Sequence, residues 1–559
     1  MKKNILILIF ATTAFISCKK GLLESPPEIL VPERLIFTEI NYVTEYVTDI
    51  YGATIQNGFS ATTSSTLIDA ASDDAKLNNL SAEIQRFGSG AWGTDNNPDD
   101  VWVRYYNGIR KCNKFFEQVN QVKTTDHGAD IIVNNITAAV QKQRLIGEVF
   151  FLRAFFYSEL VKRYGGVPLL NKTLTKGSDA NIARSTYDNC VKFITQDCDS
   201  AFNRLPADYT ASNLQNYFGR ATKWSAQALK ARVLLYAASP LNNPANDLAK
   251  WQAAMDAALP FTNGSTPFVL TAINNNMTNY EANFRGNPYS NKEMIWVLNE
   301  TNQNYLETRN YPVGFDRGGG GIAPSQNLVD AFEMKTTGKP ITDANSGYNP
   351  AQPYSNRDPR LDASILHHGS LFNGRTIDVT TGGADGPSKT NGAITGYYLK
   401  KFLDPALNLT NNQTARHFWI FFRLPEMLLN YAEARNEFSG PDASVYTALN
   451  SIRVRVGMPV LPAGLSQVQM RERIQNERRV ELVFEGHRLW DVRRWKIAET
   501  TLGSSLRGMQ VAESGATVSY TPFVLENRVF QPKMYFYPIP LYEVDVNTAI
   551  GRQNQNPGW

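Results

Sequence analysis

The sequence predicts a mainly α-helical fold, in which a scaffold of helix hairpins is interrupted by one long irregular insert. Apolar residues recur at the three- and four-residue spacing of a helix face across residues 40–260 and 420–500. Between about 261 and 419 Asn, Gly, Thr, Tyr and Pro accumulate, and a helical pattern is found only near Gln326–Met334. A chain of 559 residues with 42% hydrophobic residues can bury a large core, so we expect a globular protein.

The first residues have the features of an exported lipoprotein. Lys2 and Lys3 precede an apolar run, Ile5–Ile16, that is too short to span a bilayer, which predicts a signal peptide over residues 1–17. The run ends in Phe15-Ile16-Ser17-Cys18, which resembles a bacterial lipobox, so we expect Cys18 to be acylated. Residues 18–39 are Pro-rich and predict a lipidated tether. The alternative is ordinary secretory cleavage, with Cys18 incidental.

The scaffold helices are expected in pairs. Short, Ala-rich helix faces and close pairing favour hairpins similar to tetratricopeptide repeats, although no exact repeat consensus is present. The predicted helices are Asn41–Gln56, Val101–Val119, Gln141–Tyr164, Arg184–Arg204, Arg220–Ala238 and Ala249–Ala258, with a further hairpin over Arg423–Gly457 that breaks at Gly440-Pro441.

The most informative stretch is Gln469–Lys496. A helix there stacks Glu477, Glu481 and Glu485 on one face before Gly486 ends it, and a second helix begins at Arg488. Like charges at this spacing repel, so cations from elsewhere are expected to face the row, with Arg453, Arg455 and Arg493 as candidates. We interpret the row as a structural ion network; the alternative is a pair of catalytic acids.

Four motifs resemble the SusD/RagB family, the surface nutrient-binding lipoproteins of Bacteroidetes-type bacteria. They are NERRVELVFEGHRLWDVRRW, GEVFFLRAFFYSELVKRYGGVPLL, Arg357-Asp358-Pro359-Arg360 and the ending PKMYFYPIPLYEVDVNTAIGRQNQNPGW. The resemblance implies one SusD-like domain over residues 40–559, with the ligand surface on the irregular insert. It also implies an outer-membrane lipoprotein, exposed at the cell surface, that delivers oligosaccharides to a TonB-dependent, SusC-like barrel.

The sequence shows no catalytic, cofactor or metal motif, so we expect a binding protein rather than an enzyme. Gly318–Gly321 is followed by Ile322-Ala323-Pro324 rather than by the Gly-Lys-Ser/Thr of a phosphate loop, which predicts a hinge or tight loop. The five histidines lack zinc spacing, and no serine lies in a nucleophile elbow. The formal net charge of +4 is too small to indicate a nucleic-acid partner. Paired carboxylates for glycoside cleavage stay open, because their separation is a spatial property.

A sugar site needs aromatic planes beside hydrogen-bonding side chains, and two segments supply both. The ligand residues expected on the loop after the early helices are Asp73, Asp74, Arg86, Trp92 and Asn96; those expected on the insert are Tyr289, Tyr305, Tyr311 and Phe315. In the resembled family the ligand surface is likewise built from these two regions. Each ring has core packing as its alternative, and Trp296 is expected to be buried because its segment alternates like a strand.

Two other functions stay open. A receptor of the same family for peptides would need a deep charged cleft rather than an aromatic platform. A periplasmic repeat scaffold would bind only proteins and would not associate with the barrel.

Overall fold

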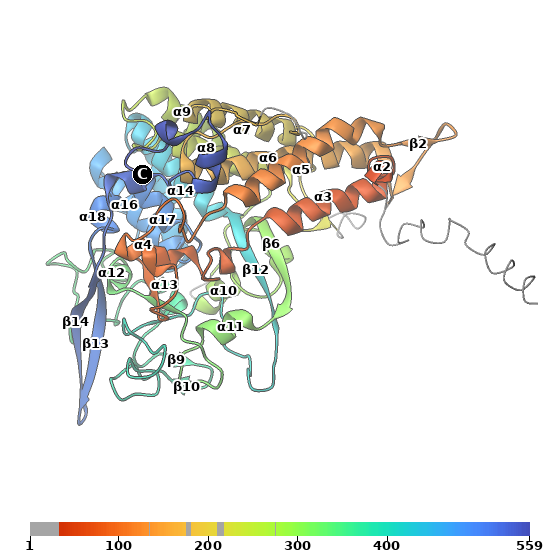
Figure 1. Cartoon of the computed structure of the whole chain (residues 1–559). Coiled ribbons are helices and arrows are strands. Elements are labelled where there is room, and N and C mark those ends of the chain that lie inside the picture. The colour runs from red at the N-terminus through yellow and green to blue at the C-terminus, as the bar shows by residue number, and fades with distance from the viewer. Residues whose placement is uncertain (1–32, 134, 175–179, 210–216, 274–275) are drawn as a thin grey trace, which may run out of the picture.

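Two layers make up the fold in the computed structural model, which describes residues 33–559 except 134, 175–179, 210–216 and 274–275. Figure 1 shows the long helices in the upper layer and the irregular insert below them. The predicted signal peptide and Cys18 lie outside the described residues. The layers share one hydrophobic core, which includes residues from the first helices to the end of the chain.

The upper layer begins with consecutive helices, each packed against the next. They are α3 (Ile40–Thr54), α5 (Trp102–Gln118), α6 (Ala138–Tyr164), α7 (Tyr187–Phe202), α8 (Lys223–Ala238) and α9 (Leu248–Ala258). Threonine side chains cap three of these helices at Thr137, Thr186 and Thr222, where they accept bonds from free backbone N–H groups. The predicted helices of this half are confirmed, and their packing is compatible with a stack of hairpins.

The C-terminal helices complete the same layer. They are α14 (Leu424–Ser439), α15 (Ala443–Arg455), α16 (Gln467–Glu481), α17 (Arg488–Arg494), α18 (Ala498–Thr501) and α19 (Leu541–Val546). Helix α14 packs on α8 and α9, so the two halves of the scaffold meet although the insert separates them in sequence. Helix α16 ends at Glu481, before the expected stop at Gly486, because the chain turns at Phe484, whose φ is 61°.

The insert contains more strand than the sequence analysis expected. Strand β6 (Met294–Gln303) pairs antiparallel with β12 (Ala415–Arg423), which closes the insert at its two ends. Trp296 on β6 is buried, as predicted. The remaining elements are β7 (Ile322–Pro324), β8 (Ile365–Leu366), β9 (Leu371–Phe372), β10 (Arg375–Thr376), β11 (Tyr398–Leu399), α10 (Met277–Ala282), α11 (Tyr305–Asn310), α12 (Gln326–Val329) and α13 (Arg360–Ser364).

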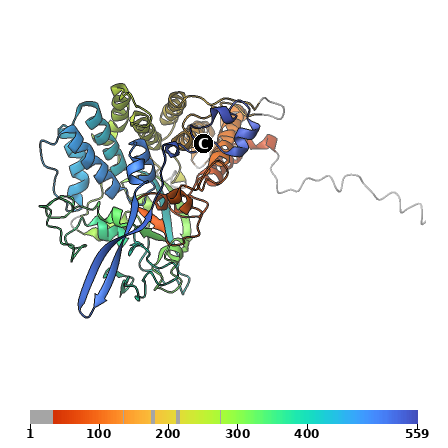
Figure 2. The same cartoon turned by 60° about the vertical axis from the view of Figure 1, so that its left-hand side comes forward.

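A long hairpin extends from the body of the protein. Strands β13 (Ser505–Ser514) and β14 (Thr517–Asn527) pair antiparallel, and Figures 1 and 2 show the ribbon projecting beside the insert. The sequence analysis did not predict it. Shorter pieces are α2 (Glu33–Ile36), α4 (Gln85–Ser89), β1 (Ala75–Leu77), β2 (Thr125–Asp126), β3 (Ala129–Asp130), β4 (Ile132–Val133) and β5 (Ile136–Thr137). Turns of 3₁₀ helix complete the elements at Gly58–Ser60, Ile68–Ala71, Val119–Gln121, Leu259–Phe261, Pro288–Ser290, Pro532–Tyr535 and Arg552–Asn554.

The last part of the predicted tether belongs to the folded body. Helix α2 lies within residues 18–39, and Phe37 is buried, with its ring centroid 5.0 Å from that of Tyr46 on α3. The burial of Phe37 removes apolar surface from water, so this part of the chain is held in place. The predicted tether, residues 18–39, therefore overlaps with the folded body, which already includes Glu33–Ile36 and Phe37.

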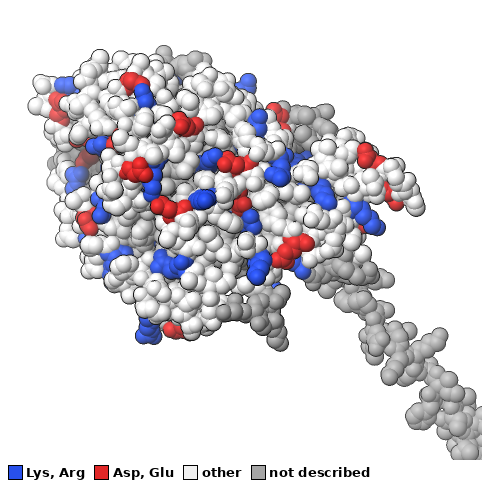
Figure 3. Space-filling model, turned by 90° about the horizontal axis from the view of Figure 1, so that it is seen from above, with Lys and Arg blue, Asp and Glu red and all other residues white. Residues whose placement is uncertain are grey.

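The surface carries both signs of charge. Figure 3 shows lysine and arginine interspersed with aspartate and glutamate on the face seen from above. Over the residues that the structure describes, no helix combines the length and the apolar character needed to cross a bilayer.

Candidate functional site

A groove lies where the loop after α3 meets the insert. Its volume is about 280 Å³, and it runs between the segment that joins α3 to α5, residues 55–101, which we call the early loop, and helix α11. We call it the polar groove; it is lined by Phe59, Ser64, Ser65, Thr66, Leu67, Leu77, Asn79, Leu306, Thr308, Arg309, Asn310, Gly319, Gly321 and Asn391. The groove therefore lies between the early part of the chain and the insert, but none of the nine ligand residues expected from the sequence lines it.

Backbone pairing holds the early loop against the insert. Strand β1 pairs antiparallel with β7, with Ala75 opposite Pro324. The N–H of Asn78 donates to Gly321 O at 2.9 Å, and the N–H of Ser325 donates to Asp74 O at 2.8 Å. Because these bonds join main chains, the groove has its shape without the help of a ligand.

Gly319 and Gly321 of the glycine run Gly318–Gly321 form part of one wall of the groove. Gly320 has a φ of 71°, and a Cβ there would lie 2.1 Å from Asn391 O. Only glycine permits this approach of two backbones. The prediction of a tight loop is thus confirmed.

The polar groove is rich in hydroxyl and amide groups and poor in charge. Arg309 is exposed and, over the part of the chain that the structure describes, is the only charged residue that lines the groove. Its guanidinium donates to Ser65 O and lies 5.8 Å from the ring of Tyr305, one helical turn earlier. The Tyr305 hydroxyl accepts a bond from Asn57 Nδ2 at 3.3 Å. This arrangement can bind a ligand that carries many hydroxyl groups.

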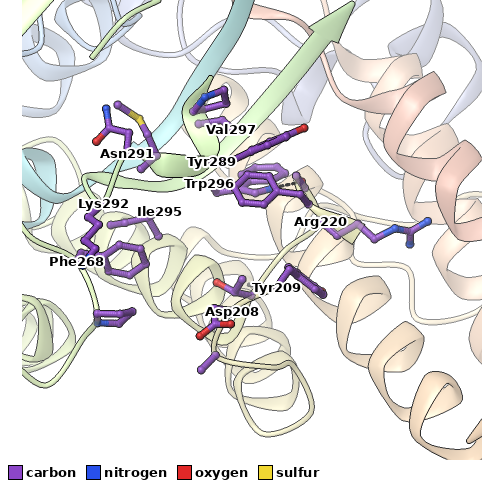
Figure 4. A pocket seen from close by; sticks show the side chains of 17 residues that line it. Asp208, Tyr209, Arg220, Phe268, Tyr289, Asn291, Lys292, Ile295, Trp296 and Val297 are labelled. Atoms are coloured by element: carbon purple, nitrogen blue, oxygen red, sulfur yellow. Dashed lines mark hydrogen bonds between the residues drawn. The ribbon is translucent and has the colours of Figure 1, made fainter. Parts of the chain in front are cut away.

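Tyr289 lies in a different cavity, which we call the aromatic pocket. Its volume is about 310 Å³ (Figure 4). The lining residues are Ala207, Asp208, Tyr209, Phe218, Gly219, Arg220, Thr222, Pro267, Phe268, Pro288, Tyr289, Asn291, Lys292, Met294, Ile295, Trp296 and Val297. The structure therefore separates Tyr289 from Tyr305.

Tyr311 and Phe315 pack inside the insert. Tyr311 is buried, and its hydroxyl donates to Asp404 O. Burial raises the pKa of Tyr311, and the nearby Glu307 adds to this effect. Phe315 is half-buried, with the Arg375 guanidinium 3.9 Å from its ring centroid. The expectation that Tyr311 offers an open plane is wrong, because its ring contacts those of Phe315 and Phe372.

Trp92 is also buried. Only 5% of its surface is exposed, and its ring lies 4.8 Å from that of Trp559 and 5.2 Å from that of Tyr537. These partners come from the end of the chain. Trp92 therefore packs the C-terminal segment onto the early loop, and the expected exposed platform is contradicted.

Asp73 and Asp74 belong to an ion network. Arg488 donates to both oxygens of Asp73 at 2.8 Å, and Arg479 donates to Asp74 at 2.7 Å. Burial acts to raise the pKa of Asp73, but Arg488 and Arg479 outweigh it and hold that pKa below its usual range. With their carboxylates paired and buried, these residues tie the early loop to α16 and α17.

Arg86 and Asn96 lie near each other, and neither lines the polar groove. Arg86 is half-buried and donates to the backbone oxygen of Asn96 at 3.3 Å. It lines a shallow hollow of about 350 Å³, together with Lys76 and Glu526. Lys76 and Glu526 form an ion pair, and Arg86 and Asn96 keep exposed surface.

The carboxylate row on α16 is matched by cations, as predicted. Glu477 accepts from Arg453 at 2.9 Å, and Glu481 accepts from Arg455 at 2.6 Å. The third candidate, Arg493, instead donates to the backbone oxygens of Met534 and Leu489. Burial acts to raise the pKa of Glu481, but the surrounding guanidinium groups lower it well below its usual range. Glu485 lies beyond the end of α16 and accepts from Arg423 at 2.7 Å and Lys401 at 2.6 Å, so all three carboxylates of the row belong to structural ion pairs.

None of the residues that line the groove was predicted as a ligand residue from the sequence. Arg309 could have been found, because it follows Tyr305 by four residues on one helix face. Ser64, Ser65, Asn79 and Asn391 had no comparable signal, since only the tertiary fold brings them to α11. Within the described residues, no group of three or more His, Cys, Asp or Glu side chains is placed to hold a metal ion.

Two family models match the chain. The model of the SusD family covers residues 289–559, and a model described as starch-binding and associating with the outer membrane covers residues 23–235. Among curated relatives, SusD-like protein P25 of Formosa agariphila is 23% identical over 98% of this chain and 97% of its own. SusD-like protein P38 of the same organism is 26% identical over 72% of this chain and 73% of its own.

Solved structures have the same fold. A SusD-like protein from Bacteroides fragilis is 31% identical with a TM-score of 0.79, over 95% of this chain and 99% of that chain. A SusD-like carbohydrate binding protein from the same species is 22% identical with a TM-score of 0.75, over 92% of this chain and 99% of that chain. The second likeness shows the fold alone.

Proposed function

Because the chain belongs to the SusD/RagB family, we propose that it binds oligosaccharides in the polar groove and delivers them to a transporter of the outer membrane. In this proposal the protein is a lipoprotein held at the cell surface through Cys18. Its partner is a TonB-dependent, SusC-like barrel. The protein binds its ligand and passes it on without chemical change.

The polar groove is the observation that supports this proposal most strongly. Ser64, Ser65 and Asn79 from the early loop face Thr308 and Arg309 of α11 across one hollow. Hydroxyl, amide and guanidinium groups are suited to the hydroxyl rim of a sugar, because each can donate hydrogen bonds to sugar oxygens, and the exposed Arg309 keeps its charge in contact with water. Tyr305 does not itself line the groove, but its half-buried ring lies 5.8 Å from the Arg309 guanidinium, and in this proposal it meets the apolar face of a sugar that extends past Arg309.

The charge of the groove favours a glycan over a peptide. A peptide receptor would need several charged side chains for the backbone termini and side chains of its cargo. Arg309 is the only charged residue among those that line the polar groove. The description of one matching family model as starch-binding and associating with the outer membrane supports the same ligand class and location.

Binding can be tested by isothermal titration of the lipid-free chain, residues 19–559, with plant, algal and host oligosaccharides. Each ligand is then analysed for new reducing ends. We expect heat of binding with an intact ligand. Arg309→Ala and Tyr305→Ala should each weaken binding about tenfold or more, because each removes a contact of about 1.4 kcal/mol.

The matched control is Arg552→Ala. Arg552 is an exposed arginine that does not line the groove, and only a distant ion pair of 3.8 Å links it to Asp545. Its replacement should leave the affinity unchanged. The glycan proposal would be contradicted if no oligosaccharide of the panel bound to a protein whose circular dichroism spectrum shows that it is folded. New reducing ends would point to a glycoside hydrolase instead.

The partner and location need a test in cells. We expect a tagged chain to co-purify with a SusC-like barrel, and protease added to whole cells should digest it. A chain that co-purifies without any barrel and resists external protease would support the periplasmic scaffold instead.

A further inference from the structure

The aromatic pocket is separate from the polar groove, and no residue of the described chain lines both cavities. It lies between the chain that precedes α8 and the start of β6. Its volume of about 310 Å³ is at the small end of the range for small-molecule sites, about 300–1,000 Å³. The proposed function leaves this pocket without a role.

The floor of the pocket is built by the core. The indole N–H of Trp296 donates to Gly219 O at 3.0 Å, and its ring stacks on Phe421 with centroids 4.4 Å apart. Phe151 and Phe155 of α6 meet the same indole edge to face. Because these contacts come from three elements, the floor is rigid before any ligand binds.

Half-buried aromatic rings form the walls. The rings of Phe218 and Tyr289 are in contact, and Phe268 stands on another side of the cavity in Figure 4. The N–H of Tyr289 donates to Asn287 Oδ1 at 3.0 Å, which places the ring at the start of a 3₁₀ turn. These rings keep part of their apolar surface open to the cavity.

The rim carries one acid and one amine. Asp208 and Lys292 are exposed and lie on different sides of the cavity in Figure 4. Lys292 makes no ion pair with the residues that the structure describes. Arg220 points away from the cavity, because it donates to Glu148 at 2.6 Å. The Asn291 amide donates to Asn283 at 2.9 Å and is therefore also occupied.

We propose that the aromatic pocket is a second carbohydrate site that takes one neutral sugar ring of a glycan. The apolar C–H face of the ring packs on Phe218 and Tyr289, and its hydroxyl groups bond to Asp208 and Lys292. A single acid and a single amine balance in charge, so a neutral ring fits better than a uronate or a sulfated sugar. The ligand class rests on the proposed function, whereas the location of the site does not.

The test uses sugars small enough to enter the pocket. D-glucose, D-galactose, D-mannose and D-xylose are each added at millimolar concentration to residues 19–559, and saturation-transfer NMR measures binding. We expect at least one sugar to bind, with about fivefold weaker binding to Tyr289→Ala. Lys292→Ala, which alters only an exposed side chain, should also weaken binding of that sugar.

Two variants separate this proposal from the function of the groove. Arg309→Ala should leave monosaccharide binding in the pocket intact, and Tyr42→Ala, at an exposed tyrosine of α3, should change nothing. One outcome is that Arg309→Ala weakens oligosaccharide binding, while neither Tyr289→Ala nor Lys292→Ala changes the monosaccharide signal. The second site is then overturned and the proposed function stands. The opposite outcome is that Tyr289→Ala and Lys292→Ala weaken the monosaccharide signal, while Arg309→Ala leaves oligosaccharide binding unchanged. The pocket is then supported and the assignment of the groove fails.

Discussion

The guanidinium of Arg360 donates to the carboxylate of Glu477 at 2.6 Å, and it also reaches Glu481 at 2.9 Å. Arg360 begins α13 in the insert, whereas both glutamates lie on α16 of the scaffold. Asp358 binds the other side of the same guanidinium at 2.7 Å and 3.0 Å. All of these groups are buried, so the pairing fixes the insert to the helices that carry it.

Arg360→Met should strongly destabilise the protein. Removal of the cation leaves buried carboxylates without their partner, which costs about 3–5 kcal/mol. Thermal unfolding followed by circular dichroism measures the effect. Arg471→Met is the matched control, because its side chain is 37% exposed and pairs only with Glu437 near the surface. Arg471→Met should lower the free energy of unfolding by less than about 1 kcal/mol. Equal losses of stability in the two variants would contradict a structural role for the buried network.

Trp92→Ala should lower stability rather than ligand affinity. The change opens a cavity among Phe87, Tyr537 and Trp559 and should cost about 3–5 kcal/mol. Urea unfolding and sugar titration of the fraction that stays folded separate the two effects. Asn96→Ala, at an exposed position of the same loop, should be close to neutral. A fully folded Trp92→Ala protein with reduced affinity would restore Trp92 as a ligand residue.

Asp69 should make stability depend on pH. Burial and the neighbouring Asp74 raise the pKa of Asp69 to about 7, while Lys401 and the Gly486 N–H act in the opposite direction. The folded state then holds a proton more tightly than the unfolded state, so this residue lowers stability as pH rises from about 4 to about 7. Asp69→Asn should flatten that part of the curve, as measured by urea unfolding at several pH values. The exposed Asp95→Asn should not, and an unchanged curve for Asp69→Asn would refute the assignment.

Gly320→Ala should distort the polar groove. Its φ of 71° disfavours a side chain, and the new Cβ would lie 2.1 Å from Asn391 O. We expect a loss of more than about 1 kcal/mol in thermal unfolding, together with weaker oligosaccharide binding. Gly374→Ala separates strain from crowding, because Gly374 has a φ of 78° but no neighbour within 4 Å of its Cβ position. Similar losses of stability in the two variants would mean that the clash with Asn391 O adds nothing to the backbone strain.

Cys18→Ala should release the protein from the membrane. The acyl chains attached to Cys18 would supply the anchor, at about 0.8 kcal/mol for each buried CH₂ group. Labelled palmitate and fractionation of cells measure the change. Membrane retention and undiminished labelling of Cys18→Ala would show that the anchor lies elsewhere.

The helical scaffold could be predicted because the apolar pattern that indicates a helix involves residues only three or four positions apart in the chain. The spacing of apolar residues in Val101–Val119 and Gln141–Tyr164 matches α5 and α6 to within a few residues. The row of Glu477, Glu481 and Glu485 likewise indicated that cations must face it. The β13–β14 hairpin was missed because the alternation of apolar residues in its sequence is interrupted at Gly508 and Pro522, so neither strand shows a continuous half-buried pattern.

The helices, the irregular insert and the motifs that mark the family can all be read from the amino-acid sequence. Which aromatic rings are open and which are packed depends on the tertiary fold. Trp92 is buried by Tyr537 and Trp559 from the far end of the chain, while Tyr305 lies beside a groove that the early loop completes. Helical periodicity depends on contacts within a few residues, whereas the exposure of a side chain depends on whatever segment the fold brings against it.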